Sequence, residues 1–198
     1  TRNPRKKPRP KKAPSNPAPM PRWRRTDADR VQQCGIFSLD RVRFEPPEGG
    51  EPRPFWVLDL PEWVNVIALT ADGRVPMVRQ YRFGIEQVTL EIPGGMCDPG
   101  EEPLTAARRE LKEETGYEAD EWVELGWVHP NPPLQNNRCY TFLARGARKT
   151  AEPQPDPNER FEQLLVPFDD VTRRMREGEI THALVITAFQ LYERYRAG

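Results

Sequence analysis

The stretch GMCDPGEEPLTAARRELKEETGY, residues 95–117, indicates more about fold and function than any other part of the chain. Its second half predicts a helix, because Pro103 suits a first helical turn, where an N–H is not needed, and the final glycine supplies a left-handed stop. An apolar stripe at spacings of three and four residues is formed by Leu104, Ala107 and Leu111. Such a stripe packs against a sheet. We therefore expect an amphipathic helix that follows a glycine loop.

The predicted helix also carries three carboxylates on one side. Glu110 and Glu114 are four residues apart with Glu113 beside them, although like charges at this spacing destabilise a helix. The one lysine of the helix, Lys112, points elsewhere. Hard oxygen ligands gathered in this way suit Mg²⁺ or Mn²⁺. On charge pattern alone, a Glu-rich solvated face remains the alternative.

The spacing of these residues resembles the Nudix box, G-x5-E-x7-R-E-U-x-E-E-x-G-U, in which U is a bulky apolar residue. Every fixed position is filled, and Tyr117 at the last apolar position is a mild departure that concerns no catalytic residue. The resemblance implies an α/β protein, a Nudix-type α/β/α sandwich with a mixed sheet and extra N-terminal strands. It also implies hydrolysis of a diphosphate that is linked to another moiety.

The resemblance further implies roles for single residues. The metal ligands would be the Gly94 carbonyl, Glu110, Glu113 and Glu114. Glu101 and Arg109 would form an ion pair that orients the catalytic helix against the glycine loop. Bound Mg²⁺ or Mn²⁺ would neutralise charge on a pyrophosphate and lower the pKa of a water molecule.

The general base stays open among three glutamates. Related pyrophosphatases place it on the loop before the last strand, where this chain has Glu159 and Glu162. Glu159 is the first choice because it lies at the end of the loop, whereas Glu162 falls at the start of the strand. Some relatives use a glutamate of the box, which here would be Glu113.

Segments around the box indicate the substrate. Residues 78–82, VRQYR, and 91–95, EIPGG, are similar to the V-x-Q-Y-R and E-x-P-A/G-G patterns of ADP-ribose pyrophosphatases. The candidate substrate-binding residues are Arg79, Arg82, Glu91, His129 and Asn131. Both arginines could instead be structural, and His129 could be an ordinary loop histidine. The implied reaction is Mg²⁺-dependent cleavage of ADP-ribose or a nucleotide sugar to a nucleoside monophosphate and a sugar phosphate.

Two other functions remain alternatives. One is a pyrophosphohydrolase for RNA 5′ ends or nucleoside triphosphates, with RNA delivered by a basic tail. The other is a Nudix-like ligand-sensing module without catalysis, against which the retained, mutually repelling carboxylates argue.

The remaining elements follow from hydrophobic patterns and turn signals. Strands are expected at residues 35–44, 54–58, 63–71, 75–81, 122–128 and 139–143. Helices are expected at residues 169–176 and 181–195. This order places a mixed sheet between helices.

The chain divides into a tail and one domain. Residues 1–30 hold 11 Lys/Arg against 2 Asp/Glu and are rich in proline, so we expect a disordered tail whose charge could contact nucleic acid. Residues 31–198 form the enzyme domain, and residues 31–60 supply the strands that related enzymes use to form homodimers.

The compartment follows from what the sequence lacks. No apolar run approaches the roughly 18 residues of a membrane span, and the basic start has no signal-peptide core. Three cysteines without a zinc pattern suit a reducing environment. We therefore expect a cytoplasmic enzyme that acts on a small nucleotide.

Overall fold

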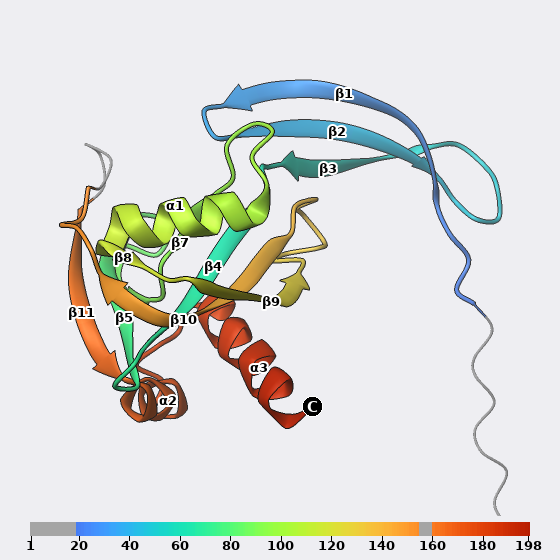
Figure 1. Cartoon of the computed structure of the whole chain (residues 1–198). Coiled ribbons are helices and arrows are strands. Elements are labelled where there is room, and N and C mark those ends of the chain that lie inside the picture. Colours follow the sequence, from blue (N-terminus) through green and yellow to red (C-terminus); the bar gives the residue numbers. More distant parts are fainter. Residues whose placement is uncertain (1–18, 155–159) are drawn as a thin grey trace, which may run out of the picture.

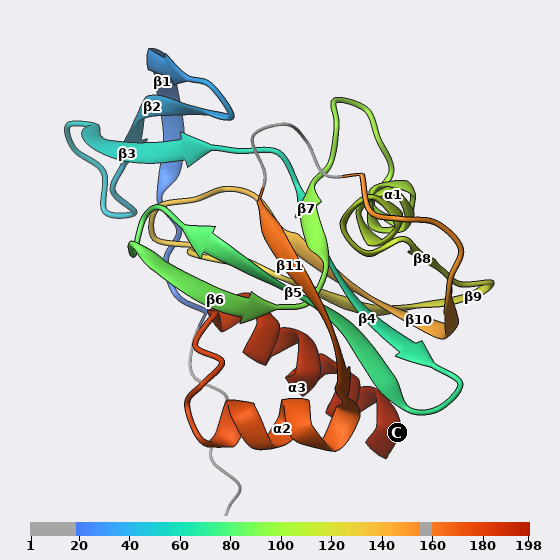
Figure 2. The same ribbon diagram turned by 90° about the vertical axis from the view of Figure 1, so that its left-hand side faces the viewer.

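Two β-sheets form the body of the protein, and helices cover them from both sides (Figures 1 and 2). The computed structural model describes residues 19–154 and 160–198. In chain order, the described elements are β1 (Arg24–Cys34), β2 (Phe37–Glu45), β3 (Arg53–Asp59), β4 (Trp63–Thr70), β5 (Arg74–Arg82), β6 (Gln87–Glu91), β7 (Gly94–Met96), α1 (Pro103–Thr115), β8 (Tyr117–Glu118), β9 (Glu121–Val128), β10 (Cys139–Lys149), β11 (Phe161–Pro167), α2 (Phe168–Arg176) and α3 (Ala183–Ala197).

The larger body sheet has the order β7-β4-β10-β8, with β9 also paired to β10, and the smaller has the order β11-β5-β6. Strands β4 and β10 pair in parallel, whereas β9 and β10, β4 and β7, and β5 with both of its neighbours pair antiparallel. The predicted mixed sheet is therefore confirmed.

Strand β4 is buried on both faces. Val64 and Val66 pack in one core cluster with Leu111 of α1, whereas Ile67 packs in a second cluster with Phe189 of α3. Successive side chains of a strand point to opposite faces, so a strand with helices on both sides reads as a continuous apolar run. This two-sided burial is the physical basis of the α/β/α arrangement, which matches the prediction.

The helices lie close to where the sequence places them. Helix α1 begins at Pro103, and Gly116 ends it with a left-handed φ of 70°. Helices α2 and α3 begin and end within two residues of the predicted ranges 169–176 and 181–195. No helix within residues 19–154 and 160–198 combines the length and apolar character needed to cross a bilayer.

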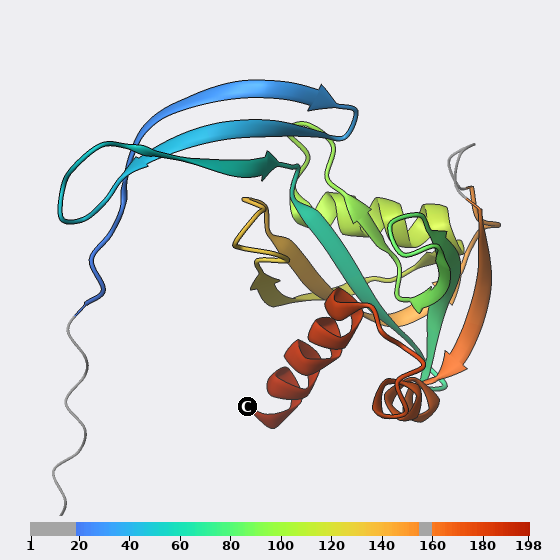
Figure 3. The ribbon, with the colours of Figure 1, turned by 180° about the vertical axis from the view of Figure 1, so that it is seen from behind.

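A third sheet, with the order β1-β2-β3, extends from the body as an arm (Figures 1 and 3). Its last strand is tied to the loop before β10, because the Leu58 N–H donates to the Leu134 carbonyl at 2.8 Å. The structure thus contains the expected extra N-terminal strands. The expected boundary of the tail needs correction, since residues 24–30 belong to β1; residues 1–18 lie outside the described residues.

Charge pairing explains why residues 24–30 form a strand. Asp27 accepts a hydrogen bond from Arg43 at 2.9 Å, and Asp29 accepts one from Arg41 at 2.9 Å. Each of these pairs lies directly opposite across β1 and β2, where opposite charges stabilise a sheet. The charged residues that indicate disorder along the sequence therefore neutralise one another between strands.

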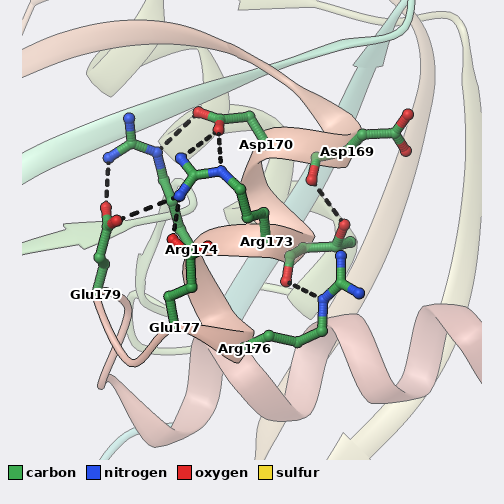
Figure 4. Close-up of polar contacts among 8 residues, drawn as sticks. Asp169, Asp170, Arg173, Arg174, Arg176, Glu177 and Glu179 are labelled. Carbon is green, nitrogen blue, oxygen red and sulfur yellow. Dashed lines mark hydrogen bonds and ion pairs between the residues drawn. The ribbon is translucent and has the colours of Figure 1, made fainter.

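Helix α2 carries an ion-pair network on its surface (Figure 4). Arg174 donates to Asp170 and to Glu179, each at 2.8 Å, and Arg173 bonds to Asp170 and Glu177. All five side chains are between 30% and 51% exposed. Water therefore screens every charge in this network.

Candidate active site

Helix α1 approaches strand β7 at two glycines. The Gly94 N–H donates to Oε2 of Glu114 at 3.0 Å. A methyl group on Gly95 would lie 2.3 Å from Oε1 of Glu110, and one on Gly94 would lie 2.2 Å from the carbonyl oxygen of Val64. Any side chain at either position would displace its neighbours. The glycine pair therefore lets the backbone of β7 lie directly beside the carboxylates of α1.

Arg109 connects the carboxylates of this site. Its guanidinium donates to both carboxylate oxygens of Glu101, at 3.1 and 2.9 Å, and to the Met96 carbonyl at 3.0 Å. The remaining nitrogen, Nη1, donates to Glu110 at 2.9 Å and to Glu113 at 3.1 Å. The structure thus contains the expected Glu101–Arg109 pair and shows that Arg109 also contacts two of the three box carboxylates.

The same pair fixes the glycine loop. Oε2 of Glu101 accepts the Asp98 N–H at 2.9 Å, so the carboxylate joins loop and helix. Hydrogen bonds from Arg109 hold the pKa of Glu101 below its ordinary value. Hydrogen bonding to Glu101 likewise raises the pKa of the Arg109 guanidinium. Both groups are therefore ionised at neutral pH, and their ion pair holds α1 against the glycine loop.

The three box carboxylates differ in exposure. Glu114 is buried at 4%, the Glu110 side chain is 13% exposed, and the Glu113 side chain is 44% exposed. They supply hard oxygens around the two close-approach glycines, which is the donor chemistry of a Mg²⁺ or Mn²⁺ site. Among the described residues, no three His, Cys, Asp or Glu side chains are grouped closely enough to hold a metal ion as they stand. Arg109 holds Glu110 and Glu113, while Glu114 turns toward Gly94.

Glu91 shares the face of the sheet that α1 covers. Gln163 of β11 lies opposite Val78, and Val78 lies opposite Glu91, so the three form one row across the sheet. Nε2 of Gln163 donates to the Glu114 carbonyl at 2.7 Å, which shows that this row faces α1. The sheet therefore presents Glu91 on the same side as the box carboxylates.

Glu91 holds Arg82 through two hydrogen bonds. Arg82 donates to Oε1 at 2.8 Å and to Oε2 at 2.7 Å, and the Thr89 hydroxyl donates to Oε1 at 2.5 Å. Burial opposes ionisation of Glu91, but these hydrogen bonds outweigh it and keep its pKa below the ordinary value. The carboxylate is buried and the guanidinium is 42% exposed, so the pair offers a fixed arginine at the surface.

Arg79 and Glu162 lie on the other side of the sheet. They pair directly across β5 and β11 and form a salt bridge of 2.9 Å. Leu90 continues their row and packs on the core cluster of α2 and α3. The structure therefore does not bring either residue to the carboxylates of α1. Glu159, the first-choice base, lies outside the described residues.

His129 and Asn131 organise their own loop. His129 Nδ1 lies 3.2 Å from the Asn137 carbonyl, and its ring meets Trp127 edge to face at 5.1 Å. The Asn131 carbonyl accepts the N–H groups of the third and fourth residues after it. Their contacts within the described residues are thus to the loop and β9, and none is to α1.

Sequence reasoning did not single out four residues that support the site. They are Asn65, Thr89, Gln163 and His182. Asn65 touches Gly94 and donates to the Leu184 carbonyl at 3.2 Å, which ties the start of α3 to β4. None of the four belongs to the box, and all but Thr89, which contacts Glu91 within β6, acquire their contacts through strand pairing or helix docking. The alternation of Thr89 and Glu91 in β6 is the one signal that the sequence contained.

Comparisons with known proteins concern the family and the fold. The model of the NUDIX domain family matches residues 60–188. An ADP-ribose pyrophosphatase of Bacillus subtilis is 33% identical over 131 residues, which are 66% of this chain and 71% of that protein. An ADP-ribose pyrophosphatase of Mycobacterium tuberculosis is 31% identical over 161 residues, or 80% and 77%. The crystal structure of an ADP compounds hydrolase has the same fold, with a TM-score of 0.75, 23% identity, and coverage of 87% and 93%.

Proposed function

Because this chain belongs to the Nudix family, we propose that it hydrolyses the pyrophosphate bond of ADP-ribose or a related nucleotide sugar. The products are a nucleoside monophosphate and a sugar phosphate. The observation that carries the proposal is the acid-rich site at α1, where Arg109 bonds to Glu101, Glu110 and Glu113, and a fourth carboxylate, Glu114, lies beside the two close-approach glycines. Matches to two ADP-ribose pyrophosphatases support the substrate class.

The residues present fit a divalent metal. Glu110, Glu113, Glu114 and the carbonyl of Gly94 would hold Mg²⁺ or Mn²⁺. The bound metal would polarise the phosphoryl oxygens and lower the pKa of water. Arg109 keeps α1 against the loop through Glu101, so the carboxylates stay beside β7.

Hydrolysis then requires a base and an anion-binding group. Oxygen of the attacking water bonds to one phosphorus, the bridging P–O bond breaks, and the base takes the proton of the water. Among the described residues Glu113, the most exposed of the three box carboxylates, would take this role instead of binding the metal. Glu159 remains the alternative base. Arg82, held by Glu91, would bind the charged part of the substrate.

The test is turnover with Mg²⁺ across ADP-ribose, several nucleotide sugars, diadenosine polyphosphates, nucleoside triphosphates and 5′-triphosphorylated RNA. The expected result is preference for ADP-ribose or a nucleotide sugar, with a nucleoside monophosphate released. Preference for the triphosphates or RNA would show that the proposed substrate class is wrong and that the enzyme is a triphosphate or RNA 5′-end pyrophosphohydrolase. Tight ligand binding without turnover of any compound would show that the protein is a ligand-sensing module and not an enzyme.

We also propose that the enzyme is a homodimer whose contact includes the arm β1-β2-β3. The arm exposes large apolar side chains, among them Val31, Ile36, Phe55 and Trp56, between 42% and 60% exposed. Sedimentation equilibrium should give twice the mass of one chain, and a monomer would refute the proposal.

We place the enzyme in the cytoplasm. Its three cysteines are all free thiols, which supports a reducing compartment.

A further inference from the structure

A histidine outside every sequence motif faces the Arg82–Glu91 pair. His182 precedes the first residue of α3, and its Nε2 lies 3.7 Å from Oε2 of Glu91. Arg82 Nη2 donates to the same oxygen at 2.7 Å. Two nitrogen groups therefore share one carboxylate oxygen, but only Arg82 is within hydrogen-bond distance.

The position of the imidazole is fixed from α3. Asn65 of β4 donates to the Leu184 carbonyl, which anchors the helix start two residues after His182. The His182 carbonyl accepts the Val185 and Ile186 N–H groups at 3.1 and 3.2 Å. The backbone at and after His182 is thus held, which fixes the point from which the ring approaches Glu91.

If this position had only a structural role, an apolar side chain would be more stable there than histidine. Nδ1 of His182 is buried and has no hydrogen-bond partner within residues 19–154 and 160–198. A buried polar atom without a partner costs stability, and an apolar side chain would avoid that cost. The charged groups that face the ring are Glu91 from β6 and Arg82 from β5. The placement therefore points to an effect on this pair.

We propose that His182 is a positioning residue for Arg82, the arginine assigned to the substrate. While His182 is neutral, it closes one side of the Glu91 carboxylate and does not compete with Arg82 for either oxygen. When His182 gains a proton, it competes for Oε2 and repels the guanidinium, so Arg82 is no longer held in place for the substrate. This inference rests on the proposed function and deepens it, because it makes substrate binding dependent on pH.

The direction of the effect follows from the surroundings of the ring. Burial lowers the pKa of His182 below its ordinary value of 6.5, and the nearby Glu91 carboxylate only partly opposes this. The imidazole is therefore neutral at neutral pH and becomes charged on the acid side. Substrate binding should weaken as the pH falls below 6.5, while the chemical step at α1 is not affected by this group.

The test compares His182→Gln, His182→Ala and the control Thr181→Ala across pH 5 to 8. Thr181 is exposed, adjoins His182, and makes no described side-chain contact with Glu91. The wild-type KM for ADP-ribose should rise about 10-fold on the acid side, near the lower limit for the loss of a hydrogen bond to a charged group. His182→Gln should show a KM that does not change with pH in this way and a kcat within about twofold of wild type.

The alanine variant adds a second readout. His182→Ala should raise KM about fivefold at neutral pH, because water then reaches Glu91 and weakens its hydrogen bonds to Arg82, whereas His182→Gln, whose side chain fills much of the same space, should lose much less. An unchanged acid-side rise of KM in His182→Gln would overturn the proposal. Equal losses in both variants with the same fall in Tm would also overturn it, because they would indicate a structural role.

Binding without turnover separates this inference from the proposed function. Calorimetric titration of ADP-ribose in the presence of a chelator measures Kd and should show the same pH dependence and the same loss of it in His182→Gln. If wild-type protein binds ADP-ribose but never hydrolyses it, the proposed function fails and the Kd values still decide the role of His182. If it neither binds nor hydrolyses ADP-ribose or any of the nucleotide sugars, both fail.

Discussion

Helices α1 and α2 each carry arginines that bond to several carboxylates, but the two networks differ in balance and burial. On α2, two arginines bond to three carboxylates, and every side chain is at least 30% exposed. On α1, Arg109 bonds to three carboxylates and a fourth, Glu114, is buried at 4%. By the distances between their charged atoms alone, both networks would count as surface ion pairs.

The difference shows how a functional site can be distinguished from a solvated face. The α2 network is nearly neutral and wet, so its pairs contribute little. The α1 network has a surplus of negative charge in a partly buried place, which costs stability unless a cation arrives. Such a surplus is retained where a ligand neutralises it, and the following experiments test that distinction.

The largest effect is expected for Glu114→Gln. The amide can still accept the Gly94 N–H, so the fold should persist, but the charge that would bind metal is lost. We expect turnover to fall on the order of 10³-fold with a Tm near that of wild type. Activity measured over a range of Mg²⁺ concentrations checks this. A nearly wild-type rate would refute the ligand assignment and make α1 resemble α2.

The next comparison replaces one arginine in each network. Arg109→Met removes an ion-pair partner of Glu101 and of Glu110 in a partly buried site, so the free energy of unfolding should fall by about 2 kcal/mol. Arg173→Met on α2 is the matched control, and its Tm should change by less than about 2 °C. Chemical denaturation of both variants measures the difference. Equal losses would show that α1 is no more shielded than α2.

Alanine substitutions at the two glycines of β7 should separate an effect on activity from an effect on stability. The methyl group of Gly95→Ala strikes the mobile end of Glu110, so the carboxylate must move, and we expect roughly a tenfold loss of kcat with a small change in Tm. The methyl group of Gly94→Ala strikes the Val64 backbone, which cannot move, so that variant should mainly lose stability. Paired kinetic and melting measurements test this. The reverse pattern would contradict the described geometry.

Acid stability should also depend on the α1 pair. Hydrogen bonds from Arg109 lower the pKa of Glu101 below 4.5, so its contribution is complete above about pH 4.5 and is lost as the pH falls through the folded value. In this acid range the free energy of unfolding of Arg109→Met should therefore fall less steeply with pH than that of wild type. Denaturation midpoints from pH 2.5 to 6 measure the slope. A slope equal to that of wild type would mean that Glu101 gains nothing from Arg109.

The smallest effect is expected for salt on α2. The pairs of Asp170 with Arg173 and Arg174 are exposed, so 0.5 M NaCl should remove most of their attraction. The Tm difference between wild type and Asp170→Asn should be below about 2 °C at low salt and vanish at high salt. A larger difference that persists in salt would show that this network is shielded after all.

Sequence patterns predicted the parts of this protein that depend on local chemistry. The box spacing predicted α1, its cap at Gly116 and the Glu101–Arg109 pair, because these contacts join residues fewer than ten positions apart. Hydrophobic runs predicted β4, α3 and the first part of β10, whose expected range ended at residue 143. The Nudix family could be recognised from the same local pattern.

The sequence alone failed where distant segments meet. Charge density along residues 24–30 indicated disorder, but the partners of these charges lie on β2. Strands β6 and β7 are too short to give a clear period. Glu162 lies next to Gln163 in sequence, yet pleating places them on opposite faces, and only the pairing of β11 with β5 decides which one faces α1.

The box by itself determined the family and the acidic helix, because 3.6 residues per turn bring its carboxylates to one side whatever surrounds them. The tertiary structure decided what supports that helix. Gly94 reaches Glu114, Glu91 holds Arg82, and His182 faces Glu91 only because strands pair and α3 packs against β4. These contacts join residues up to about ninety positions apart, and chain distance carries no information about them until the sheets have formed.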